Sequence, residues 1–175
     1  MTAAVPAPFA PVPVERPGGG RITDKTSPDP ADIVVVEGFG RAVPLHRLAA
    51  GAWAALLAAA RTDGYVAPLL LPVSGYRSVE EQAWLWEGAL AKYGDPEVAC
   101  LWVARPGTSA HQSGRAVDCH LGDPIESEYA DRMRSTPAYG WLATHAAAFG
   151  FYPYDVEPWH WEYNPPWEVL AGAGE

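Results

Sequence analysis

Two histidines and one aspartate in the second half of the chain have the side-chain types of a metal site. His111 and Asp118 lie in the run SAHQSGRAVD, and His160 lies in EPWHWEY. Zinc accepts imidazole nitrogen and carboxylate oxygen at roughly 2.0–2.2 Å, and a catalytic zinc keeps three protein ligands and an open fourth position. These three residues can therefore supply a ligand set for Zn²⁺.

The spacing of these residues requires the backbone to turn. A straight strand rises about 3.3 Å per residue, so it would hold His111 and Asp118 too far apart to share a metal. Gly114 lies between them and allows a reversal, because it can adopt positive φ without a Cβ clash. Glu157 and His160 are three residues apart and would point to opposite faces of a regular strand. We expect a local turn at Pro158 that brings the Glu157 carboxylate round to the metal site.

The remaining histidines have weaker contexts. His46 and His145 lie within helical runs, where a histidine is usually a packing or surface residue. His120 is different, because in the segment GRAVDCHL it would share one strand face with Asp118. It stays open as a residue that could replace or support a metal ligand.

Three helices are predicted around this site. The Ala- and Leu-rich run 45–61 has one apolar face and ends at Asp63 and Gly64, where a left-handed cap belongs. A second helix follows Ser78, which forms a capping-box pattern with Glu81, and it ends at Gly94. The third helix is expected within 137–150.

Strands are expected at 65–76, 100–107 and 114–121, followed by the aromatic segment 151–167. Short antiparallel strands mixed with helices indicate an α+β fold. We therefore predict a single domain in which a small antiparallel sheet, flanked by helices, carries the zinc site.

The first 30 residues differ in composition from the rest. They hold seven prolines and the run Gly18–Gly20, which favours an extended arm over packed structure. We predict a flexible arm over 1–30 and the catalytic domain over 31–175.

Composition excludes several classes of partner. A formal charge of -9 with only 12 Lys and Arg leaves no basic patch for nucleic acid. No stretch approaches the roughly 20 apolar residues of a membrane span. The first residues lack the basic and apolar regions of a signal peptide, and the compartment stays open. We expect a monomer, and whether Cys100 and Cys119 pair is open.

The order SGYRSxxxQ, SxHxxGxAxD, a helix with WL and GF, and EPWHW resembles the VanY-type zinc D-Ala-D-Ala carboxypeptidases and the related L-Ala-D-Glu endolysin peptidases of family M15. The resemblance runs from about Leu45 to Tyr163. It implies His111, Asp118 and His160 as the zinc ligands.

The same resemblance assigns roles to other residues. It implies Glu157 as the catalytic base and Arg77 as a residue that contacts the substrate and the developing oxyanion. It places Gln82 and Ser109 in the substrate pocket. We also assign Trp159 to the substrate site, as an aromatic that helps to exclude water.

The implied function is that of a zinc metallopeptidase which hydrolyses a peptidoglycan stem peptide, with D-Ala-D-Ala carboxypeptidase activity. Two departures bear on it: the segment FYPYDV before Glu157 is short, and Glu162 stands where many relatives have Arg. One alternative is a zinc peptidase acting on a peptide from outside the cell wall. The other is a non-catalytic zinc module, which would need a fourth protein ligand such as His120.

Overall fold

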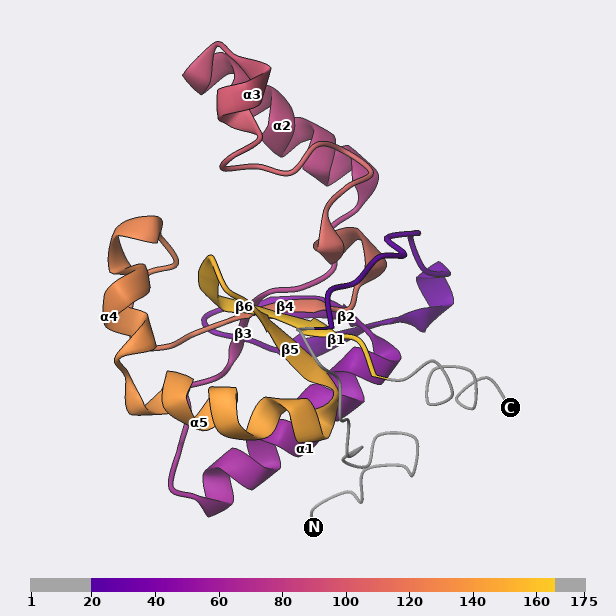
Figure 1. Ribbon diagram of the computed structural model, residues 1–175. Helices are drawn as coiled ribbons and strands as arrows, with labels where there is room; N and C mark the ends of the chain where they lie inside the picture. The colour runs from indigo at the N-terminus through magenta and orange to yellow at the C-terminus, as the bar shows by residue number, and fades with distance from the viewer. Residues whose placement is uncertain (1–19, 166–175) are drawn as a thin grey trace.

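The computed structural model describes residues 20–165 of the chain (Figure 1). Its centre is a four-stranded antiparallel sheet in the order β3-β4-β6-β5. The strands are β3 (Pro72–Ser74), β4 (Ala116–Cys119), β5 (Phe151–Tyr154) and β6 (Glu157–Tyr163). A separate hairpin joins β1 (Ile33–Glu37) to β2 (Ala42–His46). The α+β prediction with a small antiparallel sheet is confirmed.

The helices fall into two groups, one packed on the sheet and one that extends away from it (Figure 1). The α-helices are α1 (Arg47–Thr62), α2 (Val79–Tyr93), α3 (Pro96–Ala99), α4 (Ala130–Arg134) and α5 (Pro137–His145). Short 3-10 turns are η2 (Pro30–Asp32), η3 (Ala110–Ser113), η4 (Ser127–Tyr129) and η5 (Ala146–Phe149). In Figure 1, α1 and α5 lie on one side of the sheet, whereas α2 and α3 extend away from it.

The predicted helix ends are confirmed. The Ser78 hydroxyl accepts from the Glu81 N–H while the Glu81 carboxylate accepts from the Ser78 N–H, which completes the capping box of α2. Gly94 ends that helix in the left-handed conformation. Helix α1 ends at Thr62 with Asp63 as its cap residue, followed by Gly64 with φ +92°.

The hydrophobic core lies where α1 and α5 meet the sheet. The Trp53 ring packs edge-on against Phe151 at 4.8 Å, and both residues are buried. Trp161 of β6 and Leu142 of α5 are also buried in this cluster. Helix α2 buries only Gln82 and Ala89, so packing against the core contributes little to its position.

One strand prediction is wrong and a second is only partly confirmed. The segment 100–107 contains no strand, because Asp95 caps a helical turn and the N–H groups of Leu101 and Trp102 bond back to Val98 and Ala99. The strand expected at 65–76 is reduced to β3, since residues 67–70 form a turn and Pro68 has no N–H to donate to a ladder.

The N-terminal segment packs more closely than its composition suggests. Residues 1–19 of the expected arm lie outside the described residues. Residues 20–29 contain no helix or strand, but Ile22 is only 3% exposed. The Asn164 side chain donates to the carbonyls of Gly20 and Arg21 at 3.0 and 2.9 Å. We define residues 20–29 as the N-terminal strap; it buries apolar surface that a freely solvated arm would expose.

Two further sequence questions are answered for residues 20–165. None of the helices there is long and apolar enough to cross a membrane. Cys100 is exposed and Cys119 is buried, and neither forms a disulfide.

Candidate metal centre and active site

The three predicted ligands converge in a buried cluster. His111 Nε2 lies 3.2 Å from Asp118 Oδ2, and His160 Nδ1 lies 2.9 Å from Asp118 Oδ1. One potential ligand atom from each residue lies within 4.8 Å of the other two, and all three residues are buried. The aspartate therefore stands between two imidazoles, each of which aims a nitrogen at it.

The sheet places two of these ligands side by side. In the β4–β6 ladder Asp118 is the direct partner of His160, and in the β3–β4 ladder it faces Ser74. Residues paired across antiparallel strands have Cβ atoms about 4.5–5.5 Å apart, so the strand register alone brings the two side chains together.

The third ligand arrives through the predicted reversal. His111 lies in η3, which ends at Gly114 with φ +69° before β4 begins. A Cβ at position 114 would meet the His46 backbone nitrogen at 3.1 Å, so both the conformation and the space favour glycine.

The carbonyl oxygen of Gly75 fixes the His111 ring. His111 Nδ1 lies 2.7 Å from it and donates, so Nε2 is the ring nitrogen that faces Asp118. Gly75 must itself lack a side chain, because a Cβ there would lie 2.3 Å from the Pro44 carbonyl oxygen. The glycine of SGYR is thus needed for close packing beneath the ligand.

The His160 ring is held through its opposite nitrogen. Nδ1 faces Asp118, while Nε2 lies 3.2 Å from Oε1 of Glu162, a side chain with 0% exposure. Burial opposes charging, yet the hydrogen bonds to Asp118 and Glu162 raise the pKa of His160 to about 9. Burial likewise opposes ionisation of Asp118, but the two histidines lower its pKa far below the ordinary value.

This arrangement fits a zinc ion. Two ring nitrogens and a carboxylate oxygen converge, and the second nitrogen of each ring already has an acceptor, as is usual for histidines that bind a metal. Three protein ligands would leave one tetrahedral position open. Among residues 20–165 no other group of His, Cys, Asp or Glu converges in this way.

Glu157 lies at the edge of the cluster. Its Oε2 is 3.9 Å from His160 Nδ1, and its side chain is 38% exposed. In the β5–β6 ladder Pro153 pairs with Trp161, and the next residue of β5, Tyr154, pairs with Glu157. The three residues of β6 in between, 158–160, therefore have no direct partner in β5. The expected turn at Pro158 is absent, because Pro158 lies within β6; this bulge in the pairing with β5 brings Glu157 and His160 to the same site instead. Burial raises the pKa of Glu157.

Arg77 is anchored from two sides. One guanidinium nitrogen donates to Gln82 Oε1 at 2.9 Å and another to Ser74 Oγ at 3.4 Å. The Gln82 amide nitrogen donates to the Ala104 carbonyl at 2.6 Å, and Gln82 is 1% exposed. Because both ends of this amide are engaged, Gln82 holds Arg77 in place and does not itself face open space.

The other predicted site residues have different surroundings. Ser109 directly precedes η3, and its hydroxyl does not cap that turn. Trp159 is 7% exposed and belongs to the hydrophobic core, so its contact with substrate stays a prediction.

The remaining histidines lie outside the ligand cluster. His120 stacks on Phe39 at 3.9 Å between ring centroids. His46 caps α1 by accepting from the Leu48 N–H, and His145 bonds to the Trp141 carbonyl. All three have structural partners of their own.

The sequence profile of a known family covers these features. Residues 43–166 match the family described as VanY, D-alanyl-D-alanine carboxypeptidase, and the match includes all three ligands, Glu157 and Arg77. The chain belongs to the VanY family.

Curated relatives of this VanY-family chain agree with the profile. The D-alanyl-D-alanine carboxypeptidase of Enterococcus faecalis is 37% identical over 129 residues, which cover 62% of this chain and 44% of the relative. The putative carboxypeptidase YodJ of Bacillus subtilis is 30% identical over 77% of this chain and 54% of its own. The chain thus spans about half the length of these relatives.

Solved structures share the fold. The LdcB LD-carboxypeptidase superposes with a TM-score of 0.65 at 27% identity, over 82% of this chain and 72% of its own. A VanY D,D-pentapeptidase in complex with Zn(II) superposes with a TM-score of 0.57 at 29% identity, over 86% of this chain and 89% of its own. VanYB in complex with D-alanine-D-alanine superposes with a TM-score of 0.56 at 30% identity, over 82% of this chain and 83% of its own.

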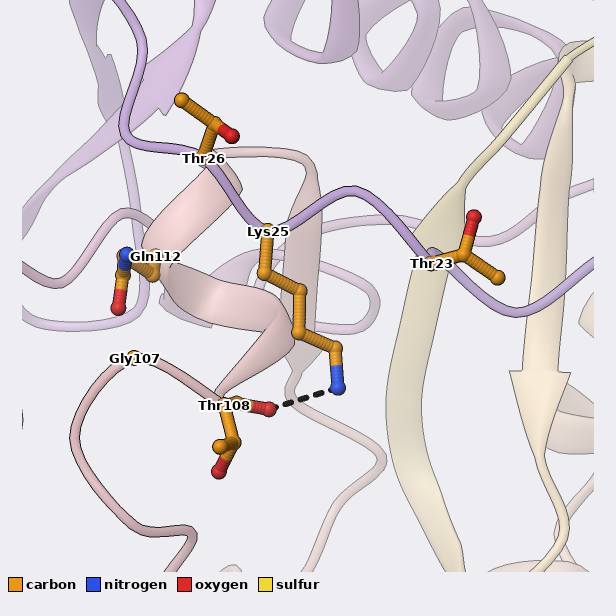
Figure 2. Close-up of a pocket in the computed structure, with 6 residues that line it drawn as sticks. All are labelled: Thr23, Lys25, Thr26, Gly107, Thr108 and Gln112. Atoms are coloured by element: carbon orange, nitrogen blue, oxygen red, sulfur yellow. Dashed lines mark hydrogen bonds between the residues drawn. The ribbon is translucent and has the colours of Figure 1, made fainter.

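A polar hollow of about 370 Å³ lies beside η3, between the N-terminal strap and the turn that leads into Ser109. Figure 2 shows Lys25 reaching across it, where Nζ donates to the Thr108 carbonyl at 2.7 Å. The strap therefore contacts the loop that carries Ser109 and His111.

Sequence reasoning missed two groups that position the ligands. The Gly75 carbonyl could not be found, because a backbone acceptor has no side-chain signature. Glu162 had a signal: it is a carboxylate two residues from a histidine ligand, so in a strand it lies on the same face. Hydrogen bonds from His160 and Ile22 and the charge of Arg21 outweigh burial and lower the pKa of Glu162.

Proposed function

We propose that this chain is a zinc-dependent D-Ala-D-Ala carboxypeptidase that removes the last residue of a peptidoglycan stem peptide. One observation carries the proposal: in a VanY-family chain, His111, Asp118 and His160 converge with the carboxylate of Glu157 beside them. The Zn(II) and D-alanine-D-alanine complexes of similar proteins support this choice of metal and substrate.

His111, Asp118 and His160 hold the metal, which when bound activates water and polarises the scissile carbonyl. Glu157 accepts the proton of the attacking water and passes it to the departing amine. Its raised pKa suits both steps, since a base that holds a proton more readily is a better acceptor and remains able to donate.

Arg77 supplies a fixed positive charge to the substrate. Its guanidinium faces a carboxylate or a developing oxyanion, and one such donor, well placed, contributes about 3–4 kcal/mol to the transition state. Gln82 and Ser74 keep the fork in one orientation. We also propose that the hydroxyl of Ser109 binds the peptide beside His111. All ligands come from one chain, so we also propose that it acts as a monomer.

Purified protein loaded with zinc should be incubated with a stem pentapeptide ending in D-Ala-D-Ala and analysed by mass spectrometry. Release of a single D-Ala is the expected result, and Glu157→Gln is the inactive control. The fold likeness to the LdcB LD-carboxypeptidase favours a second candidate activity. In it, the bond that is cut joins an L-residue to the terminal D-Ala of a tetrapeptide. Cleavage of the tetrapeptide alone would replace the first proposal with the second, and cleavage of neither would contradict both.

A further inference from the structure

The side chain of Glu162 connects the metal ligand His160 to the N-terminal strap. Its Oε1 lies 3.2 Å from His160 Nε2 and 2.9 Å from Arg21 Nε. Its Oε2 lies 2.5 Å from the backbone nitrogen of Ile22. Arg21 also stacks its guanidinium over the Tyr154 ring at 3.8 Å. Three donors from two distant parts of the chain thus surround one carboxylate.

Such a carboxylate needs its partners. Glu162 is 0% exposed, and a buried charge without compensating donors is strongly unfavourable. Arg21 supplies an opposite charge and Ile22 supplies a backbone N–H, so two groups of the strap stabilise the Glu162 carboxylate. Without the strap, the carboxylate would keep only the His160 contact among the bonds described.

The ionised carboxylate fixes the state of the imidazole. It can only accept, so Nε2 of His160 carries the hydrogen of this contact, and Nδ1 is the nitrogen that a metal would take in place of its proton. The Gly75 carbonyl does the same for His111 through the other ring nitrogen. The two histidines thus present opposite nitrogens, and each orientation is set by an acceptor from outside the ligand trio.

We infer that Glu162 is a positioning residue for the metal ligand His160, and that the strap residues Arg21 and Ile22 hold Glu162 in place. The inference rests on the zinc site of the proposed function, but not on its substrate. It makes residues before the family-matched region 43–166 part of the scaffold of the metal centre.

The test measures zinc affinity by competition with a chelator in wild type, Glu162→Gln and Arg21→Ala. Glu162→Gln keeps the shape but removes the charge, and the dissociation constant should rise about 10- to 100-fold, the usual loss when an acceptor behind a metal-binding histidine is changed. Arg21→Ala should give a smaller loss of up to about tenfold, because Glu162 stays in place with weaker support. Arg21→Lys should recover part of it, since the charge returns.

Arg47→Ala is the control, because Arg47 is about as exposed as Arg21 (37% against 43%) and forms an ion pair of 2.7 Å with Asp32, away from the ligands. Its zinc affinity should match that of the wild type. A second readout is the Nε2–H proton of His160 in zinc-loaded, ¹⁵N-histidine-labelled protein. Its resonance should lie downfield in wild type and move upfield in Glu162→Gln, where the hydrogen bond loses its charge.

Two outcomes separate this inference from the proposed function. Wild-type zinc affinity in both Glu162→Gln and Arg21→Ala would overturn the inference and leave the peptidase proposal standing. If Glu162→Gln does not fold, the zinc affinity of Arg21→Ala alone tests the inference. The Arg21 side chain is 43% exposed, so its truncation is tolerated. A wild type that binds no zinc would overturn the proposed function, and this inference with it.

Discussion

Asp118 and His160 are direct partners across two antiparallel strands, and their side chains meet at 2.9 Å. Neither strand has to bend to bring these two ligands together, because the register of β4 and β6 already does so. His111, by contrast, depends on a 3-10 turn and on Gly114. The metal centre therefore combines a rigid pair with a third ligand on a turn.

Removal of one ligand tests this metal assignment. Wild type should carry about one zinc per chain, and His111→Ala or His160→Ala should lose it, because two ligands do not make a stable zinc site. Zinc at 100 times its dissociation constant should raise the free energy of unfolding of the wild type by about 2.7 kcal/mol. The same zinc concentration should stabilise both variants less. Metal analysis and thermal melts provide the measurements. His145→Ala is the control, and full zinc content in both ligand variants would contradict the assignment.

Substitution of Glu157 separates proton transfer from metal binding. Glu157→Gln keeps the shape but cannot accept a proton, so kcat should fall by about 10,000-fold or more while zinc remains bound. KM should change little, because the contacts that bind substrate survive. Steady-state kinetics with metal analysis on the same samples makes the comparison. Near-normal turnover in the zinc-loaded variant would exclude Glu157 as the base.

The anchoring of Arg77 by Gln82 predicts that Gln82 acts indirectly. Arg77→Lys keeps the charge but loses the planar fork, so KM should rise and kcat should fall. Gln82→Ala should change the same two constants in the same direction but less, since Ser74 still contacts the guanidinium. In an Arg77→Lys background, Gln82→Ala should add little. Fully additive effects in this double-mutant cycle would show that the two residues act separately.

Packing of the strap can be tested at Ile22. Its side chain is 3% exposed, so Ile22→Ala should lower the free energy of unfolding by about 2 kcal/mol or somewhat more. Val35→Ala is the control, because Val35 is 69% exposed, and it should change stability by no more than about 0.5 kcal/mol. Urea unfolding measures both. Equal stability of the two variants would mean that residue 22 does not pack in solution.

Sequence reasoning succeeded where the determinants were local. The capping box at Ser78 and Glu81 fixed the start of α2, and Gly114 was correctly placed at the reversal between His111 and Asp118. These features need only a few neighbouring residues. The wrong strand at 100–107 was also a local error, because Asp95 followed by Pro96 is a helix-start signal that outweighs the apolar run after it.

Long-range pairing was beyond the sequence. Nothing near Ile22 indicates that its N–H bonds to Glu162, which lies 140 residues further along the chain. Likewise, Gln82 was assigned to the substrate pocket from its motif, whereas its burial and its bond to Arg77 depend on how α2 meets the segment around Ala104. Such roles follow from tertiary contacts, which a single sequence does not contain.

The position of β6 sets the order of events during synthesis. His160 and Glu157 are on this strand, the last one among residues 20–165, and it pairs with β4, which carries Asp118. A nascent chain that has released residues 20–150 from the ribosome holds only two of the three ligands, and Glu162 has not yet met Arg21. Metal capture therefore waits until β6 has emerged, so a chain that stops before residue 157 would lack the third ligand and could not hold zinc in this site.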